Sequence, residues 1–230
     1  MDKPVDEIIK INKKRKEPTI SDSTVNHYLG DLSVIFNWSM NNWGVQKNPV
    51  RGMKLKIKKS SQEQRDRFTD EELQTIFDPN NFIKEIKRRK KNSRVVYPCY
   101  WVPLILLFTG CRLNEICQLH IDDIKKEDKK NIWYFDINDN DGKRLKNKTS
   151  KRKIPVHQTL IDIGLIDYWR KLKKKKEKQL FPELKQTRDG HSKGISHWFN
   201  GVYLPSLGIK IPQKKVIHSL RHTFIDTLKQ

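Results

Sequence analysis

The sequence predicts a mainly α-helical fold with a small antiparallel β-sheet, divided into a short helical unit and a larger one. Apolar residues recur at helical spacing along most of the chain, one region has the pattern of a hairpin, and a polar basic stretch separates two patterned regions. With 230 residues and a 35% hydrophobic share, the chain is long enough for one good-sized core and a smaller unit.

The first unit is predicted to contain two helices. A weak apolar pattern near the N-terminus precedes a strong amphipathic helix, for which Ser21, Asp22 and Ser23 are possible caps and Gly44 is the stop. Its apolar positions are Val25, Tyr28, Leu29, Leu32, Ile35, Phe36, Met40 and Trp43. Because two helices make a thin core, we expect residues 1–58 to be a partial helical domain that has lost an N-terminal part.

Residues 59–67 are predicted to link the units because this stretch is polar, basic and without periodicity. Thr69 and Glu72 then form a capping box that opens the larger unit, residues 68–230. A turn cluster, Asn-Asp-Asn-Asp-Gly, predicts a hairpin with a long basic loop. The predicted strands cover 132–137 and 153–156, and the predicted helices cover 70–77, 82–91, 97–109, 112–119, 160–172, 195–204 and 218–228.

The charge balance is strongly basic, with 48 Lys and Arg against 27 Asp and Glu and a formal net charge of +21. Self-repulsion on this scale is most easily tolerated when a polyanion neutralises it, so the composition favours nucleic acid as the partner. The alternative is a lysine-rich chain whose charges lie on solvated faces. No Gly-rich phosphate loop is present, which argues against a nucleotide hydrolase.

The three cysteines, Cys99, Cys111 and Cys117, form no C-x-x-C motif and are predicted to be buried free thiols. Free thiols favour a reducing cytoplasm. The longest apolar run, residues 97–110, is too short to span a bilayer and carries two prolines, so we expect no membrane association. The histidines outside the motifs below show no metal-ligand spacing, and the tryptophans mostly fall on apolar stripes typical of a core.

Two short basic motifs lie far apart in the chain. In T-G-C-R-L-N-E, Arg112 follows a Gly turn after the buried helix, and Glu115 one turn later is placed to orient it. In H-S-L-R-H, His218 and Arg221 share one face of a helix start, where a cationic cluster is well placed to bind an anion. Ordinary alternatives are an exposed Arg–Glu helix pair, a capping His218, and an Arg221 paired with a carboxylate.

Lys148 lies in K-N-K-T-S-K-R-K-I-P-V, just ahead of the second predicted strand. A loop at this position can bring an ammonium group to a leaving oxygen. The neighbouring lysines remain alternatives, and most charges in this loop are expected to be backbone contacts or solvated. These alternatives are Lys143, Lys146, Lys151 and Lys153.

Together, T-G-C-R-L-N-E, K-T-S-K-R-K-I-P-V and H-S-L-R-H-T-F resemble the tyrosine recombinase (phage integrase) family in order and spacing. The segment T-V-N-H-Y-L-G-D-L-S-V-I-F-N-W also resembles the last helices of the family's core-binding domain. The resemblance therefore implies a partial core-binding DNA-binding domain over residues 1–58 and a catalytic domain over 68–230.

The resemblance implies site-specific DNA recombination, as carried out by integrases of phages and other mobile elements. Arg112 and Arg221 would clamp the non-bridging oxygens of the scissile phosphate, His218 would assist proton transfer, Lys148 would protonate the departing 5′ oxygen, and Glu115 would support the site. A tyrosine would form a 3′-phosphotyrosyl intermediate, without metal, ATP or any other cofactor. The implied partner is double-stranded DNA, in the cytoplasm of a bacterial host. We expect the protein to be a monomer in solution and to assemble as a tetramer on DNA.

The nucleophile is the point at which the sequence departs from the family. Its tyrosines all precede His218, whereas the family's nucleophile follows the second arginine. We therefore expect a C-terminally truncated integrase that has no nucleophile in this chain and binds DNA without cleaving it. The alternative is a non-catalytic DNA-binding module, such as a decayed integrase or a regulator. The six tyrosines are Tyr28, Tyr97, Tyr100, Tyr134, Tyr168 and Tyr203.

Overall fold

The structure is a computed structural model of the 230-residue chain. It describes residues 4–15, 19–57, 67–92, 95–188, 190–209 and 215–229. The chain divides into two compact units, Met1–Glu63 and Gln64–Gln230, each of which is described by itself. Most of the predicted linker, residues 59–67, lies outside the described residues.

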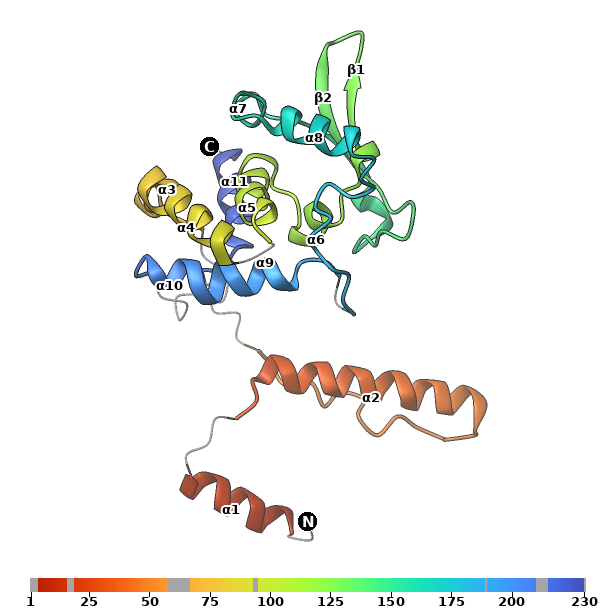
Figure 1. The fold of residues 1–230 in the computed structure, drawn as a ribbon. Helices are drawn as coiled ribbons and strands as arrows, with labels where there is room; N and C mark the ends of the chain where they lie inside the picture. The colour runs from red at the N-terminus through yellow and green to blue at the C-terminus, as the bar shows by residue number, and fades with distance from the viewer. Residues whose placement is uncertain are drawn as a thin grey trace. The chain divides into compact units, whose positions relative to one another are not determined.

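The first unit contains helix α1, Val5–Arg15, and helix α2, Asp22–Asn42 (Figure 1). Ser21 caps α2, as predicted, by accepting a hydrogen bond from the Thr24 amide at 3.2 Å. Residues after α2 return along the helix, where the Asn26 side chain pairs with both backbone groups of Leu55 at 2.8 and 2.9 Å. The unit is therefore held together largely by polar contacts.

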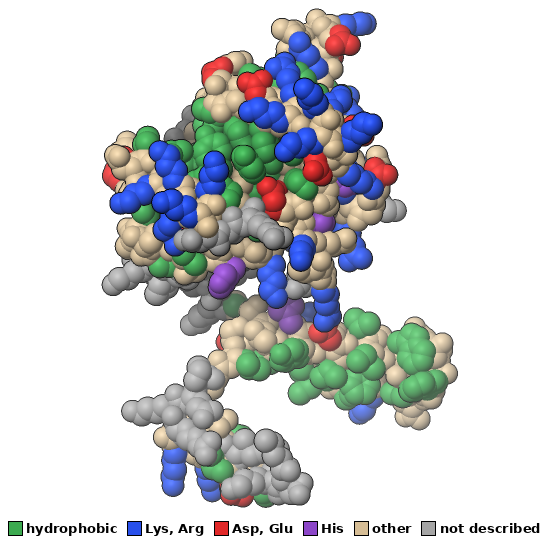
Figure 2. Space-filling model, in the orientation of Figure 1, with side chains coloured by type: hydrophobic (Ala, Val, Ile, Leu, Met, Phe, Trp, Pro, Cys, Tyr) green, Lys and Arg blue, Asp and Glu red, His purple; other side chains and the backbone are tan. Residues whose placement is uncertain are grey.

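The apolar stripe predicted on α2 is present but lies in solvent within this unit. Hydrophobic side chains follow the helix (Figure 2), and they include Tyr28, Leu32, Ile35, Trp38 and Trp43. Trp38 and Trp43 are 51% and 74% exposed, so our expectation that the tryptophans mostly lie in the core is wrong for this pair. The apolar periodicity identifies the helix correctly but does not show whether another element covers it.

The larger unit holds every buried hydrophobic side chain of the described residues. Its first helices are α3, Asp70–Phe77, and α4, Pro79–Asn92, and the predicted capping box of Thr69 and Glu72 is present at the start of α3. Helix α5, Tyr97–Thr109, is apolar around its circumference, and most of its residues are buried. It packs against α6, Leu113–Cys117, and against three helices that follow the sheet: α7, Gln158–Asp162, α9, Lys193–Trp198, and α11, Ser219–Thr227.

The sheet has three antiparallel strands in the order β1-β2-β3. They are β1, Ile124–Glu127, β2, Ile132–Ile137, and β3, Arg152–Pro155. Phe135 lies opposite Ile124 on one side and Ile154 on the other, so one apolar row crosses the sheet at its buried face. Short 3₁₀ turns precede β1 and β3, at Ile121–Asp123 and Lys148–Ser150.

The remaining helices follow the sheet. They are α7, Gln158–Asp162; α8, Leu165–Lys174; α9, Lys193–Trp198; a π-helical turn, Phe199–Tyr203; α10, Leu204–Ser206; and α11, Ser219–Thr227. The single helix predicted over 160–172 is wrong, because Gly164 has a left-handed φ of +95° and separates α7 from α8. Within the described residues, no helix combines the length and apolarity that crossing a bilayer requires.

Candidate functional site

Arg112 stands at the junction between α5 and α6. Gly110 ends α5 in the left-handed conformation, with φ of +59°, and the chain then turns into α6. A Cβ at this glycine would overlap the ring of Phe224, so α11 packs directly against the turn. The backbone N–H of Arg112 donates to Glu115 Oε2 at 2.9 Å, and its Nη1 donates to Glu115 Oε1 at 2.8 Å.

Glu115 binds a second arginine that the sequence analysis did not single out. Arg152, the first residue of β3, donates from Nη2 to Glu115 Oε2 at 2.8 Å. Burial of Glu115 works against its charge, but hydrogen bonds from Arg152 and Arg112 outweigh burial and lower the pKa of this carboxyl. The Arg112–Glu115 pair is thus a half-buried element of a cluster, and the alternative of an exposed helix pair does not hold.

Ser150 connects the same two arginines from the hairpin loop. Its hydroxyl accepts from Arg112 Nη1 at 3.0 Å, and its carbonyl accepts from Arg152 Nη1 at 2.7 Å. Arg152 Nη2 also lies 3.5 Å from the sulfur of Cys111. The alternation of β3 was the available signal for Arg152, because Arg152 and Ile154 share the less exposed face of the strand.

Arg221 approaches this cluster from α11. Its Nη1 donates to the carbonyl oxygen of Gly110, so two motifs that are far apart in the sequence meet at one turn. Burial lowers the pKa of Arg221, and the positive charges of Arg112 and Arg152 lower it further. Within the described residues, no carboxylate pairs with Arg221, which is contrary to the ordinary alternative considered for this residue.

His218 occupies the N-cap position of α11, one turn before Arg221. Its side chain makes no capping hydrogen bond, and its ring lies edge-on to His222 with the centroids 5.2 Å apart. The backbone carbonyl of His218 accepts from the Arg221 amide at 3.1 Å. The structure therefore places His218 on the helical turn that also carries Arg221.

Lys148 begins the 3₁₀ turn that ends at Ser150. The side chain of Lys148 lies outside the described part of the structure. Two residues span at most about 7.6 Å between Cα atoms, so its backbone lies close to the residue that contacts Arg112 and Arg152. This places the Lys148 backbone at the edge of the arginine cluster.

Three of the four alternatives to Lys148 have other partners, and the fourth, Lys146, is exposed. Lys143 is buried, and its ammonium binds both carboxylate oxygens of Asp123, at 2.6 and 2.5 Å. Lys151 pairs with Asp139 at 2.6 Å, and Lys153 lies over the ring of Tyr134. The Lys143–Asp123 pair anchors the base of the hairpin loop, because Asp123 also accepts from Asn138 at 2.8 Å.

The described tyrosines have no hydrogen bond to the arginine cluster. The hydroxyl of Tyr203 donates to the carbonyl of Ile76, and that of Tyr168 donates to the carbonyl of Leu180. Burial raises the pKa of both phenols. The other four lie on α2, the start of α5 and β2, and they are Tyr28, Tyr97, Tyr100 and Tyr134.

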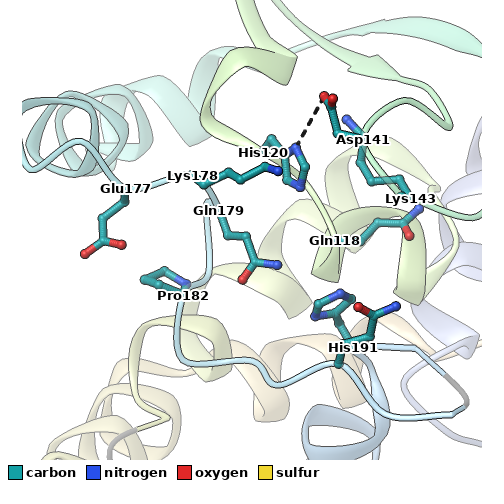
Figure 3. A pocket seen from close by; sticks show the side chains of 11 residues that line it. Gln118, His120, Asp141, Lys143, Glu177, Lys178, Gln179, Pro182 and His191 are labelled. Atoms are coloured by element: carbon teal, nitrogen blue, oxygen red, sulfur yellow. Dashed lines mark ion pairs between the residues drawn. The ribbon is translucent and has the colours of Figure 1, made fainter.

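A polar pocket of about 300 Å³ is lined in part by Gln118, the residue that follows α6 (Figure 3). His120, Lys143 and His191 line it, and His120 Nδ1 lies 3.9 Å from Asp141. Burial lowers the pKa of His120, and the charge of Lys143 lowers it further. Within the described residues, no group of His, Cys, Asp and Glu has the geometry to hold a metal ion.

Comparisons with known proteins identify the fold. No family model and no curated protein matches the sequence. The structure is similar to the Tn1549 transposon integrase in complex with circular intermediate DNA, with a TM-score of 0.56 and 19% identity over 97% of this chain and 70% of that chain. A complex of the same integrase with transposon right end DNA gives a TM-score of 0.52 and 20% identity, over 98% and 74% of the two chains.

These similarities confirm the fold class predicted from the sequence. The chain is mainly helical with a small three-stranded antiparallel sheet, and it has the fold of a transposon integrase. This agrees with the tyrosine recombinase fold expected from the three motifs. Around the Gly110 turn, the arrangement of Arg112, Arg152 and Arg221 brings three positive charges together near one carboxylate, that of Glu115.

Proposed function

We propose that this protein binds double-stranded DNA and positions one backbone phosphate at the arginine cluster formed by Arg112, Arg152 and Arg221. The observation that carries this proposal is the charge imbalance of the cluster. Within the described residues, Glu115 is the only carboxylate that forms an ion pair with any of the three guanidinium groups. A bound phosphate diester would supply the negative charge that the cluster lacks.

In this proposal, Arg112 and Arg221 bind the non-bridging oxygens of the phosphate. Glu115 and Ser150 hold Arg112 in place, while Arg152 binds other atoms of the same two residues, Glu115 Oε2 and the Ser150 carbonyl. Guanidinium groups fixed before the substrate arrives stabilise charge that develops on a phosphoryl group without further reorganisation. His218 then assists proton transfer, and Lys148 protonates the 5′ oxygen as it leaves.

The proposed reaction of the complete system is DNA breakage and rejoining. A tyrosine oxygen attacks phosphorus, the bond to the 5′ oxygen breaks, and a 3′-phosphotyrosyl link retains the phosphoryl group for rejoining. Support for a role in mobile-element recombination comes from the fold shared with the Tn1549 transposon integrase, whose structures contain DNA. We propose a tetramer on DNA, a monomer in solution, and a cytoplasmic location in a bacterial host.

We further propose that the 230 residues bind DNA without cleaving it. The support is the placement of the six tyrosines, since the two phenols with resolved hydrogen bonds are buried and bonded to backbone carbonyls elsewhere. This placement equally favours the second candidate function, a DNA-binding module without catalysis. The two candidates share the phosphate site and differ only in the source of a nucleophile.

DNA binding can be tested by fluorescence anisotropy with a labelled duplex at several salt concentrations. For about six phosphate contacts, the log–log slope of affinity against salt should have a magnitude of about 5. Arg112→Ala and Arg221→Ala should each reduce this magnitude by about 1, because each removes one phosphate contact. Arg170→Ala is the matched control, since Arg170 is exposed and pairs with Asp167 on α8. A salt-independent affinity, or cluster variants that match the control, would contradict the proposal.

Cleavage can be tested in two steps. A duplex that the protein binds is first selected from random sequences, and copies of this duplex are then nicked, each at a different position, to serve as cleavage substrates. The expected result is binding without a covalent protein–DNA adduct under denaturing conditions. An adduct that disappears when one of the six tyrosines is changed to Phe would show that the nucleophile lies in this chain. That result would overturn the proposed lack of cleavage and leave the phosphate site intact.

A further inference from the structure

A second cavity of the larger unit differs in character from the arginine cluster. It has a volume of about 630 Å³, within the range of roughly 300–1,000 Å³ that ligand pockets occupy. Residues from α4, from the start of α5 and from the α7–α8 region line it. Figure 2 shows a hydrophobic patch on this side of the larger unit, with Lys and Arg side chains around it.

The walls of this cavity are aromatic. Tyr97 stacks on Tyr168 with ring centroids 5.2 Å apart, and Trp101 also stacks on Tyr168, at 5.8 Å. Trp101 and Tyr168 are buried, whereas Tyr97 is 53% exposed and Ile163 is 40% exposed. The cavity therefore has a rigid aromatic wall and an exposed apolar rim, which is the surface composition of protein recognition sites.

The rim also carries unpaired positive charge. Lys90 lies in the last turn of α4, while Lys171 and Lys175 lie at the end of α8, and all three line the cavity and are exposed. Within the described residues, none of their ammonium groups has a hydrogen bond or ion pair. Asp167 is the only acidic residue in the lining, and Arg170 neutralises it at 2.9 Å.

We propose that this cavity is a docking site for an amphipathic acidic peptide segment of a partner protein. Apolar side chains of the segment would enter between Tyr97 and Ile163, and its carboxylates would pair with Lys90, Lys171 and Lys175. Helix-in-groove recognition combines these two kinds of contact. This inference does not depend on the proposed DNA function.

Charge and wall composition favour this occupant over two others. A second copy of the chain carries the same net charge of +21, so its surface is a poor electrostatic match for a lysine rim. Duplex DNA presents phosphates but no apolar side chains to fill an aromatic cavity. The carboxylates of an acidic amphipathic segment can pair with the lysine rim, and its apolar side chains can pack against the aromatic walls.

The cavity and the arginine cluster lie at opposite ends of α5. Tyr97 begins this helix, and Gly110 follows its last residue. At 1.5 Å per residue, the helix separates the two ends by about 18 Å. A docked segment would therefore be spatially separate from a phosphate bound to Arg112 and Arg221.

The test uses the full 230-residue protein and a displayed library of random 12-residue peptides. Selected peptides should be rich in Asp and Glu, with apolar residues at helical spacing. A Lys171→Glu/Lys175→Glu variant and a Tyr97→Ser variant should each bind these peptides at least tenfold more weakly. The control is Lys129→Glu/Lys130→Glu, which makes the same charge change on exposed lysines of the β1–β2 turn and should leave binding unchanged. Circular dichroism confirms that all the variants are folded.

Several results would overturn this proposal. Peptides that are basic, or that bind the cavity variants and the control equally, would exclude an acidic partner at this site. A single-stranded oligonucleotide could instead displace the selected peptides from the parent protein. If it also failed to bind the Tyr97→Ser variant, the cavity would be a nucleic-acid site. Self-association that light scattering detects in the parent protein and not in the Lys171→Glu/Lys175→Glu variant would identify a second copy as the occupant.

Discussion

Glu115 is the residue that fixes the geometry of the arginine cluster. It is 4% exposed and binds Arg112 and Arg152 at the same time. Removing one partner of a buried ion pair leaves uncompensated charge and costs about 3 kcal/mol of stability. Glu115→Gln should therefore lower the free energy of unfolding by about 3 kcal/mol, measured by urea denaturation at neutral pH. Glu127→Gln, an exposed glutamate on β1, is the control and should change it by less than about 0.5 kcal/mol.

The stability difference between the parent protein and Glu115→Gln should depend on pH. The folded-state pKa of Glu115 lies below the ordinary value of 4.5, despite burial, because of hydrogen bonds from Arg152 and Arg112. Between the folded and unfolded values, the unfolded chain binds more protons, so stability falls as the pH falls. The stability difference between the parent and Glu115→Gln should be fully present above pH 4.5 and shrink below it. A difference that does not vary with pH would contradict this assignment.

The residues of the site differ in how far the sequence reveals them. Arg112, Glu115 and Arg221 could be selected because each belongs to a short motif with a glycine turn or a helix start beside it. Arg152 lies among lysines in a basic run, where composition does not distinguish it from its neighbours. Strand alternation places Arg152 on the less exposed face of β3, but its contact with Glu115 joins residues that are 37 positions apart in the sequence.

At the scale of elements, Gly110 determines how α5, α6 and α11 meet. Gly110→Ala places a side chain in the left-handed region and against Phe224, and these two effects together should cost about 3 kcal/mol. Gly142→Ala is the matched control, because Gly142 has φ of +82° but no atom within 4 Å of the added Cβ. Its cost should be about 1 kcal/mol. Equal costs in thermal or urea unfolding would show that the Phe224 contact is unimportant.

Elements with their own local signal were predicted well, and elements that depend on neighbours were not. The boundaries of α5 and β2 agree with the prediction because apolar runs and turn residues mark both ends. Strand β1 was missed, since Ile124-Lys125-Lys126-Glu127 has only one buried apolar residue and forms by pairing with β2. The break at Gly164 was also missed, because apolar periodicity continues on both sides of it.

At the scale of the whole molecule, the two units differ in their buried apolar surface. Among the described residues, Ser39 is the only buried residue of the first unit, whereas the larger unit has an extensive hydrophobic core. Local opening is easiest where few apolar contacts must be broken. Backbone amides of α2 should therefore exchange with deuterium much faster than those of α5, measured by mass spectrometry on the intact chain. Equal protection of both helices would contradict this picture.

The three buried cysteines give the larger unit an intrinsic reporter of its own integrity. Burial raises the pKa of Cys99 to about 12, and it also raises the pKa of Cys111 and Cys117, so alkylating reagents find neither access nor thiolate in the closed state. Cys111 Sγ lies 3.5 Å from Arg152 Nη2, so the rate of its alkylation should report how often the arginine cluster opens. The alkylation rate of Cys111, measured with and without an anionic ligand, would therefore give the rate of this opening without an engineered probe.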